Sequence, residues 1–218
     1  MLSHGAEYKK DLILESMTRF REHLKNDGII LYPTETLWGL GVRADSSSAI
    51  KKLNAFKNRK QNQPMSLLVP NIHRAQDYAI FSEDHLKLVP IFWPGLVTFV
   101  LPCKEKTIEE VHARTNFVGL RVSNHPFVKR LFREIDFAIT TTSANPSGEP
   151  AGESLKDFES LPSEILKPAH CEENIEVLQE GSLVVKLVDK TFEVLRPSSE
   201  QAKFEKVARS LGFIKKTI

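Results

Sequence analysis

The sequence predicts an α/β fold in which one twisted sheet, with parallel and antiparallel strands, is flanked by helices. Short apolar runs alternate along the chain with amphipathic segments, as in sheets whose strands are connected by helices. Two apolar runs at 183–188 and 192–195 are separated by a hairpin-like connection, which indicates a mixed sheet. No linker or repeat marks a boundary, so we expect residues 1–218 to form a single domain.

The individual elements follow from periodicity and from stop signals. The first helix is predicted from apolar residues at helical spacing, namely Leu12, Ile13, Met17, Phe20 and Leu24, and it ends at Asn26-Asp27-Gly28. Further helices are expected at 45–56, where Asp45 to Ser48 offer N-caps, and at 83–92, 126–133 and 200–211. Strands are expected at 29–32, 66–69, 97–101, 117–122, 137–141, 183–188 and 192–195, with another apolar piece at 37–42. The segment 153–180 has the least pattern.

Composition excludes several classes of protein. The formal net charge of +2 and the pI of about 8.5 argue for no particular partner. No apolar run approaches the roughly 20 residues that span a bilayer, and charges interrupt the N-terminal residues where a signal peptide would be apolar. Cys103 and Cys171 are far apart, and the seven histidines form no HExxH pattern. We therefore expect a cytoplasmic protein with no membrane association, no disulfide and no protein-held metal.

One apparent nucleotide motif fails its structural requirements. Gly39-Leu40-Gly41-Val42-Arg43-Ala44 fits the dinucleotide fingerprint GxGxxA, but that motif must open a helix directly. Here a polar stretch beginning at Asp45 intervenes, and the position for the expected acid falls near Arg59. The chain also lacks GxxxxGK[ST], so any nucleotide is bound without a P-loop.

Two polar loops follow predicted strands. The stretch TTTSANPSGEPAG, from Thr140 to Gly152, contains almost no residue that could fill a core, and Tyr32 to Thr36 is a similar loop. Such residues favour turns for local reasons, so an ordinary capping loop is one interpretation. Ligands in open α/β sheets, however, bind beyond strand ends, where such loops gather.

A basic segment could complete a site with these loops. Lys57, Arg59 and Lys60 lie at the end of a predicted helix, before Pro64. They could be a solvated helix end that complements the helix dipole. Alternatively, their donors could bind a triphosphate. Together with the hydroxyl-rich strand ends, they predict a pocket for an anionic, polar ligand.

The combined motifs resemble the YrdC-type threonylcarbamoyl-AMP synthase family. The resemblance runs from about 24 to 197 and rests on the motifs YPTETLWGLG, Lys57-x-Arg59 with Pro64, FWPGLVTFVLP, VGLRVSNHP, TTSANPSGEPA, GSLVVKL and EVLRP. It implies a twisted mixed sheet with a concave, positively charged face. It also implies that L-threonine, bicarbonate or CO2, and ATP give threonylcarbamoyl-AMP and pyrophosphate, for N6-threonylcarbamoylation of adenosine 37 in tRNA by downstream proteins. Mg2+ would accompany ATP.

The resemblance also assigns residues by motif matching. The expected ATP contacts are Lys57, Arg59, Gln63, Ser143, Asn145 and Arg196, with Lys57 and Arg59 as the catalytic cations. The expected threonine contacts are Thr34, Thr36, Arg121, Thr141 and Ser182. Arg121 lies in a strand among apolar neighbours, which is costly unless the charge is paired. A bound carboxylate is one partner, and an internal salt bridge, for example to Glu35, is the other.

The chain departs from the family pattern at five other positions. Lys60 and Leu68 replace a proline and a histidine found in many members, and Phe117 stands where a threonine often lines the ATP site. Ala151 stands where a hydroxyl residue is usual, and Leu183 lies in a stretch, 182–186, that departs from the typical ST-V-V-D. These departures leave open a YciO-like paralogue of other activity.

The second alternative is a double-stranded RNA or tRNA-binding module that uses the basic face. RNA-binding sheets usually interleave aromatic residues with cations, and only 8% of this chain is aromatic. If the chain is a synthase, we therefore expect it to bind tRNA only weakly.

Overall fold

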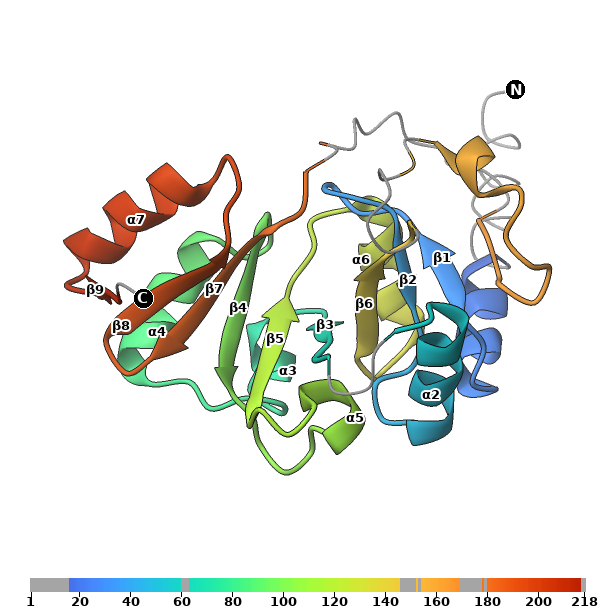
Figure 1. Ribbon diagram of the computed structural model, residues 1–218, viewed down its shortest axis with the longest axis horizontal. Coiled ribbons are helices and arrows are strands. Elements are labelled where there is room, and N and C mark those ends of the chain that lie inside the picture. Colours follow the sequence, from blue (N-terminus) through green and yellow to red (C-terminus); the bar gives the residue numbers. More distant parts are fainter. Residues whose placement is uncertain are drawn as a thin grey trace, which may run out of the picture.

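The computed structural model describes residues 16–59, 63–145, 152, 154–168, 178 and 180–216. Within these residues, nine strands join one sheet in the order β1-β2-β6-β3-β5-β4-β7-β8-β9 (Figure 1). The pairs β3–β5, β4–β7 and β8–β9 are parallel, and the others are antiparallel. The strands are β1 Ile30–Tyr32, β2 Gly39–Gly41, β3 Ser66–Leu68, β4 Val97–Pro102, β5 Phe117–Arg121, β6 Ile139–Ser143, β7 Leu183–Val188, β8 Thr191–Arg196 and β9 Ile214–Lys215. The mixed α/β sheet predicted from the sequence is confirmed.

Helices pack at both ends of this sheet. In Figure 1, α2 and α6 lie near β1, β2 and β6, whereas α4 and α7 lie near β7 and β8. The described part of the N-terminal helix covers residues 16–25. The remaining helices are α2 Ser47–Phe56, α3 Ile72–Ala75, α4 Glu83–Leu88, α5 Glu109–His112, α6 Pro126–Glu134 and α7 Gln201–Ser210, with 3-10 turns η1 Val89–Ile91 and η2 Leu155–Phe158.

Alternate residues of β1 contribute to two different apolar clusters. Ile30 and Tyr32 belong to the cluster that contains the N-terminal helix and α6, where the rings of Phe20 and Phe127 meet edge-to-face at 5.1 Å. Leu31 belongs to the larger cluster, to which α2, α4 and α7 contribute. Because side chains alternate across a strand, this part of the sheet is covered on both faces.

The glycines of the apparent dinucleotide motif have a packing role. Gly39 and Gly41 lie in β2 and do not open a helix, since α2 begins only after the N-cap Ser46. A Cβ at Gly39 would lie 2.8 Å from the Tyr32 ring, and one at Gly41 would lie 2.4 Å from the Thr140 carbonyl oxygen. These glycines let β2 fit closely between its neighbours, and they do not stand at the start of a helix as the dinucleotide fingerprint requires.

The structure also differs from the expected elements. The helix expected at 83–92 ends at Leu88 and continues as η1, because Pro90 lacks the amide donor that an α-helix needs. The short elements α3, α5, η2 and β9 were not predicted, because two to four residues show no full period. Part of the weakly patterned segment 153–180 is packed: Phe158 lies 5.5 Å from the Trp38 ring, and Leu166 bridges to Ile30.

Candidate functional site

A polar cavity of about 250 Å3 lies where the β1–β2 loop meets the ends of several strands. Eight of the eleven residues assigned from the motifs line it: Thr34, Thr36, Arg59, Arg121, Thr141, Ser143, Ser182 and Arg196. Its described lining has three arginines and no carboxylate. A surface of this kind attracts an anionic ligand, as expected from the sequence.

Strand pairing explains why distant segments meet here. β6 lies between β2 and β3, with Ser143 opposite Gly39 and Thr141 opposite Ser66. β3 in turn pairs with β5, whose last residue is Arg121. Backbone hydrogen bonds therefore hold Thr141, Ser66 and Gly119 at one level across these three strands, and Arg121 follows two residues farther along β5.

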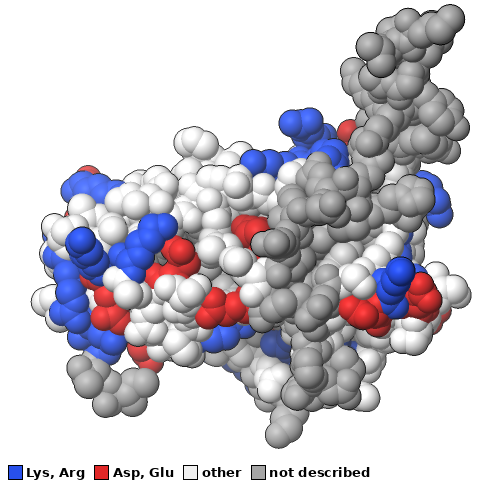
Figure 2. Space-filling model, turned by 90° about the horizontal axis from the view of Figure 1, so that it is seen from above, with Lys and Arg blue, Asp and Glu red and all other residues white. Residues whose placement is uncertain are grey.

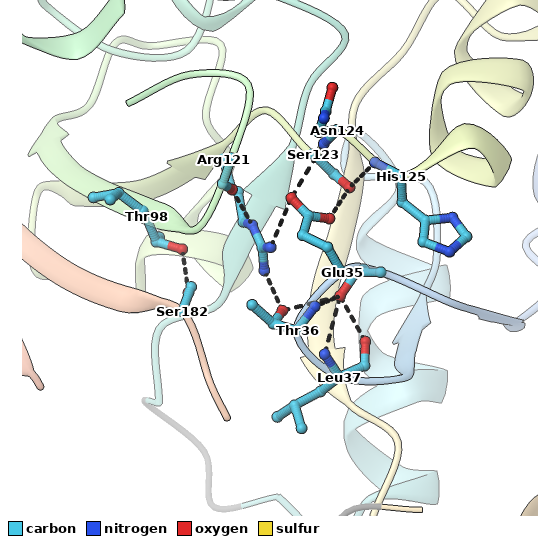
Figure 3. A network of polar contacts seen from close by, with 12 residues as sticks. Glu35, Thr36, Leu37, Thr98, Arg121, Ser123, Asn124, His125 and Ser182 are labelled. Atoms are coloured by element: carbon cyan, nitrogen blue, oxygen red, sulfur yellow. Dashed lines mark hydrogen bonds and ion pairs between the residues drawn. The ribbon is translucent and has the colours of Figure 1, made fainter. Parts of the chain in front are cut away.

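Arg121 is fixed by contacts from three directions (Figure 3). Its Nε donates to the Gly95 carbonyl at 3.0 Å, and its Nη1 donates to Thr36 Oγ1 at 2.6 Å. Its Nη2 lies 3.1 Å from Glu35 Oε1, but makes no hydrogen bond of good geometry to a described residue. The internal salt bridge considered from the sequence is therefore present. Arg121 nevertheless lines the cavity, so the ion pair and a ligand role are compatible.

Glu35 connects Arg121 to the turn before α6. Its carboxylate accepts from the Ser123 hydroxyl at 2.6 Å and from the Asn124 amide at 3.1 Å. Burial alone would raise the pKa of Glu35, but the charge of Arg121 and these hydrogen bonds outweigh it and hold the pKa below its usual value. Glu35 is therefore a charged, fully engaged partner that keeps Arg121 in place.

Thr34 stabilises the loop that carries Thr36. The Thr34 hydroxyl donates to the Leu37 carbonyl at 2.6 Å and accepts from the Thr36 and Leu37 amides at 3.2 and 3.1 Å. The only hydroxyl proton of Thr34 is donated to Leu37. In the contact of 3.0 Å between the two threonine hydroxyls, Thr36 is therefore the donor and Thr34 Oγ1 the acceptor. In this arrangement Thr34 shapes the wall and has no proton left for a ligand.

The opposite wall is organised by Ser182. Arg196 donates from Nε to the Ser182 carbonyl and from Nη2 to its hydroxyl, each at 3.0 Å. Ser182 Oγ also lies 2.7 Å from Thr98 Oγ1. A Cβ at Gly181 would lie 3.0 Å from the Arg196 guanidinium carbon, so the glycine leaves room for that group. Partial burial lowers the pKa of Arg196, and the positive charge of Arg121 lowers it further, because the two cations repel each other across the cavity.

The basic helix end makes contacts that the sequence did not indicate. Lys57 Nζ donates to the Ser143 carbonyl at 2.8 Å and also to the Asn145 carbonyl. Arg59 donates to Thr142 Oγ1 at 3.3 Å and to the Pro64 carbonyl at 2.7 Å. Burial lowers the pKa of both cations, and the charge of Arg59 adds to the effect on Lys57. Lys57, Gln63 and Asn145 lie outside the described cavity lining, whereas Arg59 lies in it.

A second cavity of about 330 Å3 shares part of the same wall. Pro64, Met65, Ser66 and Val184 line both cavities. The second lining adds mainly apolar surface, including Phe117, and Lys186 Nζ lies 3.9 Å from the centre of the Phe117 ring. A polar, arginine-lined cavity is therefore adjacent to an apolar one.

Several lining residues were missed from the sequence. Trp38, Ser66, Thr98, Thr142, Gly181 and Val184 line the polar cavity without having been assigned. Thr98 carries a signal that could have been used: it is a hydroxyl in the otherwise apolar strand VTFVLP, and only 3% of it is exposed. A buried polar group needs a partner.

The described residues offer neither a resident metal site nor a membrane span. No group of three or more His, Cys, Asp or Glu in this part of the chain could hold a metal ion. Among the same residues, no helix has the length and apolarity needed to cross a membrane. Lys60 and Ala151, two of the departures noted from the sequence, lie outside the described residues.

Known sequences similar to this chain include proteins named threonylcarbamoyl-AMP synthase. A threonylcarbamoyl-AMP synthase of Buchnera aphidicola is 32% identical over 146 residues, which cover 66% of this chain and 78% of that protein. The Bacillus subtilis protein of the same name is 34% identical over 130 residues, or 59% of this chain. The matched region spans only 38% of that longer relative.

Solved structures and a protein-family model also match this chain. Sua5 of P. abyssi complexed with L-threonine superposes with a TM-score of 0.80 at 25% identity, over 91% of this chain and 58% of that one. E. coli YciO, at 17% identity and a TM-score of 0.73 over 86% of this chain and 91% of that one, shares the fold. Residues 22–198 match the Sua5/YciO/YrdC family, described as "Telomere recombination". The chain therefore belongs to the Sua5/YciO/YrdC family.

Proposed function

We propose that the chain is an L-threonylcarbamoyladenylate synthase, which forms threonylcarbamoyl-AMP and pyrophosphate from L-threonine, bicarbonate or CO2, and ATP. The observation that carries this proposal is the polar cavity, in which Arg59, Arg121 and Arg196 converge with hydroxyl groups and whose described lining contains no carboxylate. Such a site suits a reaction that brings together the carboxylate of threonine and the phosphates of ATP. The similarity to a Sua5 protein complexed with L-threonine supports it.

Arg121 is the proposed anchor for the threonine carboxylate. The contacts to Gly95 and Thr36 use Nε and one Nη1 proton, so the outer edge of the guanidinium retains donors for a carboxylate. A carboxylate could approach this edge if Glu35 shifts slightly from Nη2. Thr36, Thr141 and Ser182 surround the same space.

ATP is proposed to occupy both cavities. Its phosphates would contact Arg59 and Arg196, and its adenine would lie against the apolar surface near Phe117. Lys57 lies close to the end of β6, because its Nζ donates to the Ser143 carbonyl. When ATP is bound, Lys57 would donate to a phosphate oxygen in place of this carbonyl. Ser143 and Asn145 follow on the same segment, and Gln63 is the remaining proposed ATP contact.

The reaction requires positioning and charge stabilisation rather than a protein nucleophile. The threonine amine adds to CO2 and loses a proton, which gives a carbamate. A carbamate oxygen then forms a bond to the α-phosphorus as the bond to pyrophosphate breaks. Arginines near the phosphates stabilise the developing charge. Mg2+ would enter on the ATP phosphates, because the described lining of the polar cavity, where the phosphates are placed, has no carboxylate ligands for it.

The wider role follows from the product. A threonylcarbamoyl adenylate is an activated acyl donor, so a downstream tRNA-modification protein must consume it. We place this reaction in the cytoplasm, and we treat the chain as one domain because its nine described strands share a sheet.

Pyrophosphate release tests the proposal directly. The purified chain is incubated with Mg-ATP, and bicarbonate and L-threonine are omitted in turn. We expect release to require bicarbonate, to be strongest with L-threonine, weaker with serine, and weakest with valine. Equal release with and without an amino acid would overturn the proposed function.

A further inference from the structure

Two buried hydroxyl groups form a pair in the wall of the polar cavity. Thr98 of β4 and Ser182, which precedes β7, are 3% and 4% exposed, and their oxygens lie 2.7 Å apart. Both residues line the cavity, and Figure 3 shows the pair beside Arg121, on the side away from Glu35. Thr98 has no role in the motif assignments.

A count of protons shows that this pair retains one donor. Two hydroxyls carry two protons, and the contact between them uses one. Ser182 Oγ also accepts from Arg196, which consumes a lone pair and no hydroxyl proton. Among the described residues, neither hydroxyl has another hydrogen-bond partner. One O–H proton is therefore buried at the cavity wall with no acceptor in the described part of the chain, which is costly unless a ligand supplies one.

The surroundings indicate what kind of ligand group fits there. Arg121 and Arg196 offer charged donors to the anionic oxygens of the substrates, which leaves the hydroxyl donor for an uncharged acceptor. Val184 lies opposite Thr98 in the β4–β7 pairing and also lines the cavity. The wall therefore presents one hydroxyl donor next to an apolar surface. This combination complements a side chain that carries a hydroxyl and a methyl group on one carbon.

We infer that Thr98, together with Ser182, reads the β-hydroxyl of the amino acid substrate and so determines selectivity for threonine. The inference rests on the proposed function. The spare proton of the pair donates to the substrate hydroxyl, and Val184 contacts the methyl group. Valine leaves the buried donor unpaired, and serine leaves the apolar surface uncovered. A site that hydrogen-bonds a substrate hydroxyl rejects the analogue that lacks it more strongly than a methyl-sized pocket can.

Substitutions at Thr98 test this inference. Thr98→Val keeps the shape of the side chain and removes its hydroxyl, Thr98→Cys is a second variant with a weak donor, and Thr98→Ser restores the hydroxyl. Thr107→Val is the matched control, because Thr107 is also buried, at 5% exposure, and donates to the Tyr78 carbonyl outside the cavity. For each protein, pyrophosphate release gives kcat and KM with threonine, serine and valine, and thermal unfolding confirms folding.

The expected result is a loss of selectivity rather than a general loss of activity. Thr98→Val and Thr98→Cys should lower the threonine-to-valine ratio of kcat/KM by roughly tenfold, chiefly through KM for threonine, as one neutral hydrogen bond predicts. The KM for ATP should stay close to wild type in the Thr98 variants, Thr98→Ser should restore the threonine-to-valine ratio, and the control Thr107→Val should behave like wild type. An unchanged ratio in folded Thr98→Val and Thr98→Cys overturns the inference alone. Wild-type release that no amino acid stimulates overturns the proposed function as well.

Discussion

Replacement of Arg121 by methionine separates the structural role of this residue from its proposed role in binding. Arg121→Met keeps the aliphatic packing and removes the charge, so Glu35 loses its cation although its side chain is only 15% exposed. Breaking a buried ion pair costs about 3–5 kcal/mol. Glu35 retains its hydrogen bonds from Ser123 and Asn124, so we expect the lower limit, about 3 kcal/mol. For a chain of this size that corresponds to a fall in Tm of about 6–12 °C.

A second substitution relieves this penalty without restoring the site. In Arg121→Met/Glu35→Gln neither partner is charged, so most of the lost stability should return. Threonine binding should remain weakened at least tenfold in both variants, because the proposed carboxylate anchor is absent. ATP affinity should stay close to wild type. Thermal unfolding gives the stability, and calorimetric titration with threonine and with Mg-ATP gives the affinities. Wild-type threonine affinity in the double variant would refute the reasoning and leave Arg121 as a purely structural partner of Glu35.

Three further predictions concern other parts of the molecule. Arg59→Ala should raise KM for ATP at least tenfold with little change in Tm, whereas the matched surface change Arg114→Ala, at a side chain that is 79% exposed, should change neither. His85 accepts from the Ser82 amide and contacts the Asp189 carbonyl, and burial lowers its pKa. Its stabilising contribution should therefore be complete above about pH 6.5 and decline as the pH falls through the lowered pKa. Urea unfolding at a series of pH values should show this slope in wild type and a smaller one in His85→Asn. Fluorescence anisotropy of labelled tRNA should show weak binding that nearly vanishes near physiological ionic strength and that Mg-ATP displaces; tight, salt-resistant binding unaffected by ATP would favour the RNA-binding alternative.

The charge distribution of the structure supports the last of these predictions. The face shown in Figure 2 carries both Lys or Arg and Asp or Glu side chains among uncharged residues. The described lining of the polar cavity, by contrast, contains three arginines and no carboxylate, and of these Arg121 is paired with Glu35 outside the lining. Positive charge is thus concentrated in a small concave site, which suits phosphates of a nucleotide better than the long backbone of a nucleic acid.

The elements of the fold were predictable where a segment was long and regular. The strand 183–188 was predicted with the bounds that β7 has, and 97–101 and 117–122 agree with β4 and β5 to within one residue. Hydrophobic periodicity is sufficient for such segments. Strand order was not predictable, because it depends on pairing between residues far apart, such as Thr98 with Val184.

The site was predictable in its composition but not in its contacts. Motif matching brought together eight residues that do line one cavity. It could not show that the Thr34 hydroxyl is used within its own turn, or that Lys57 contacts backbone carbonyls. Nor could it show that Arg121 has both an acidic partner and a place in the cavity. These features depend on side-chain directions, which the order of residues along the chain does not determine.

Mass spectrometry of the product formed with 13C-bicarbonate tests the central claim most directly. The wild-type chain is incubated with Mg-ATP, L-threonine and either labelled or unlabelled bicarbonate, and the nucleotide products are separated at once. The proposed mechanism predicts an adenylate that contains both threonine and one bicarbonate-derived carbon, so its mass rises by one 13C with the labelled substrate. Pyrophosphate should appear in equal amount. ATP consumption that yields only AMP or ADP, or an adenylate that carries no label from bicarbonate, would contradict the account.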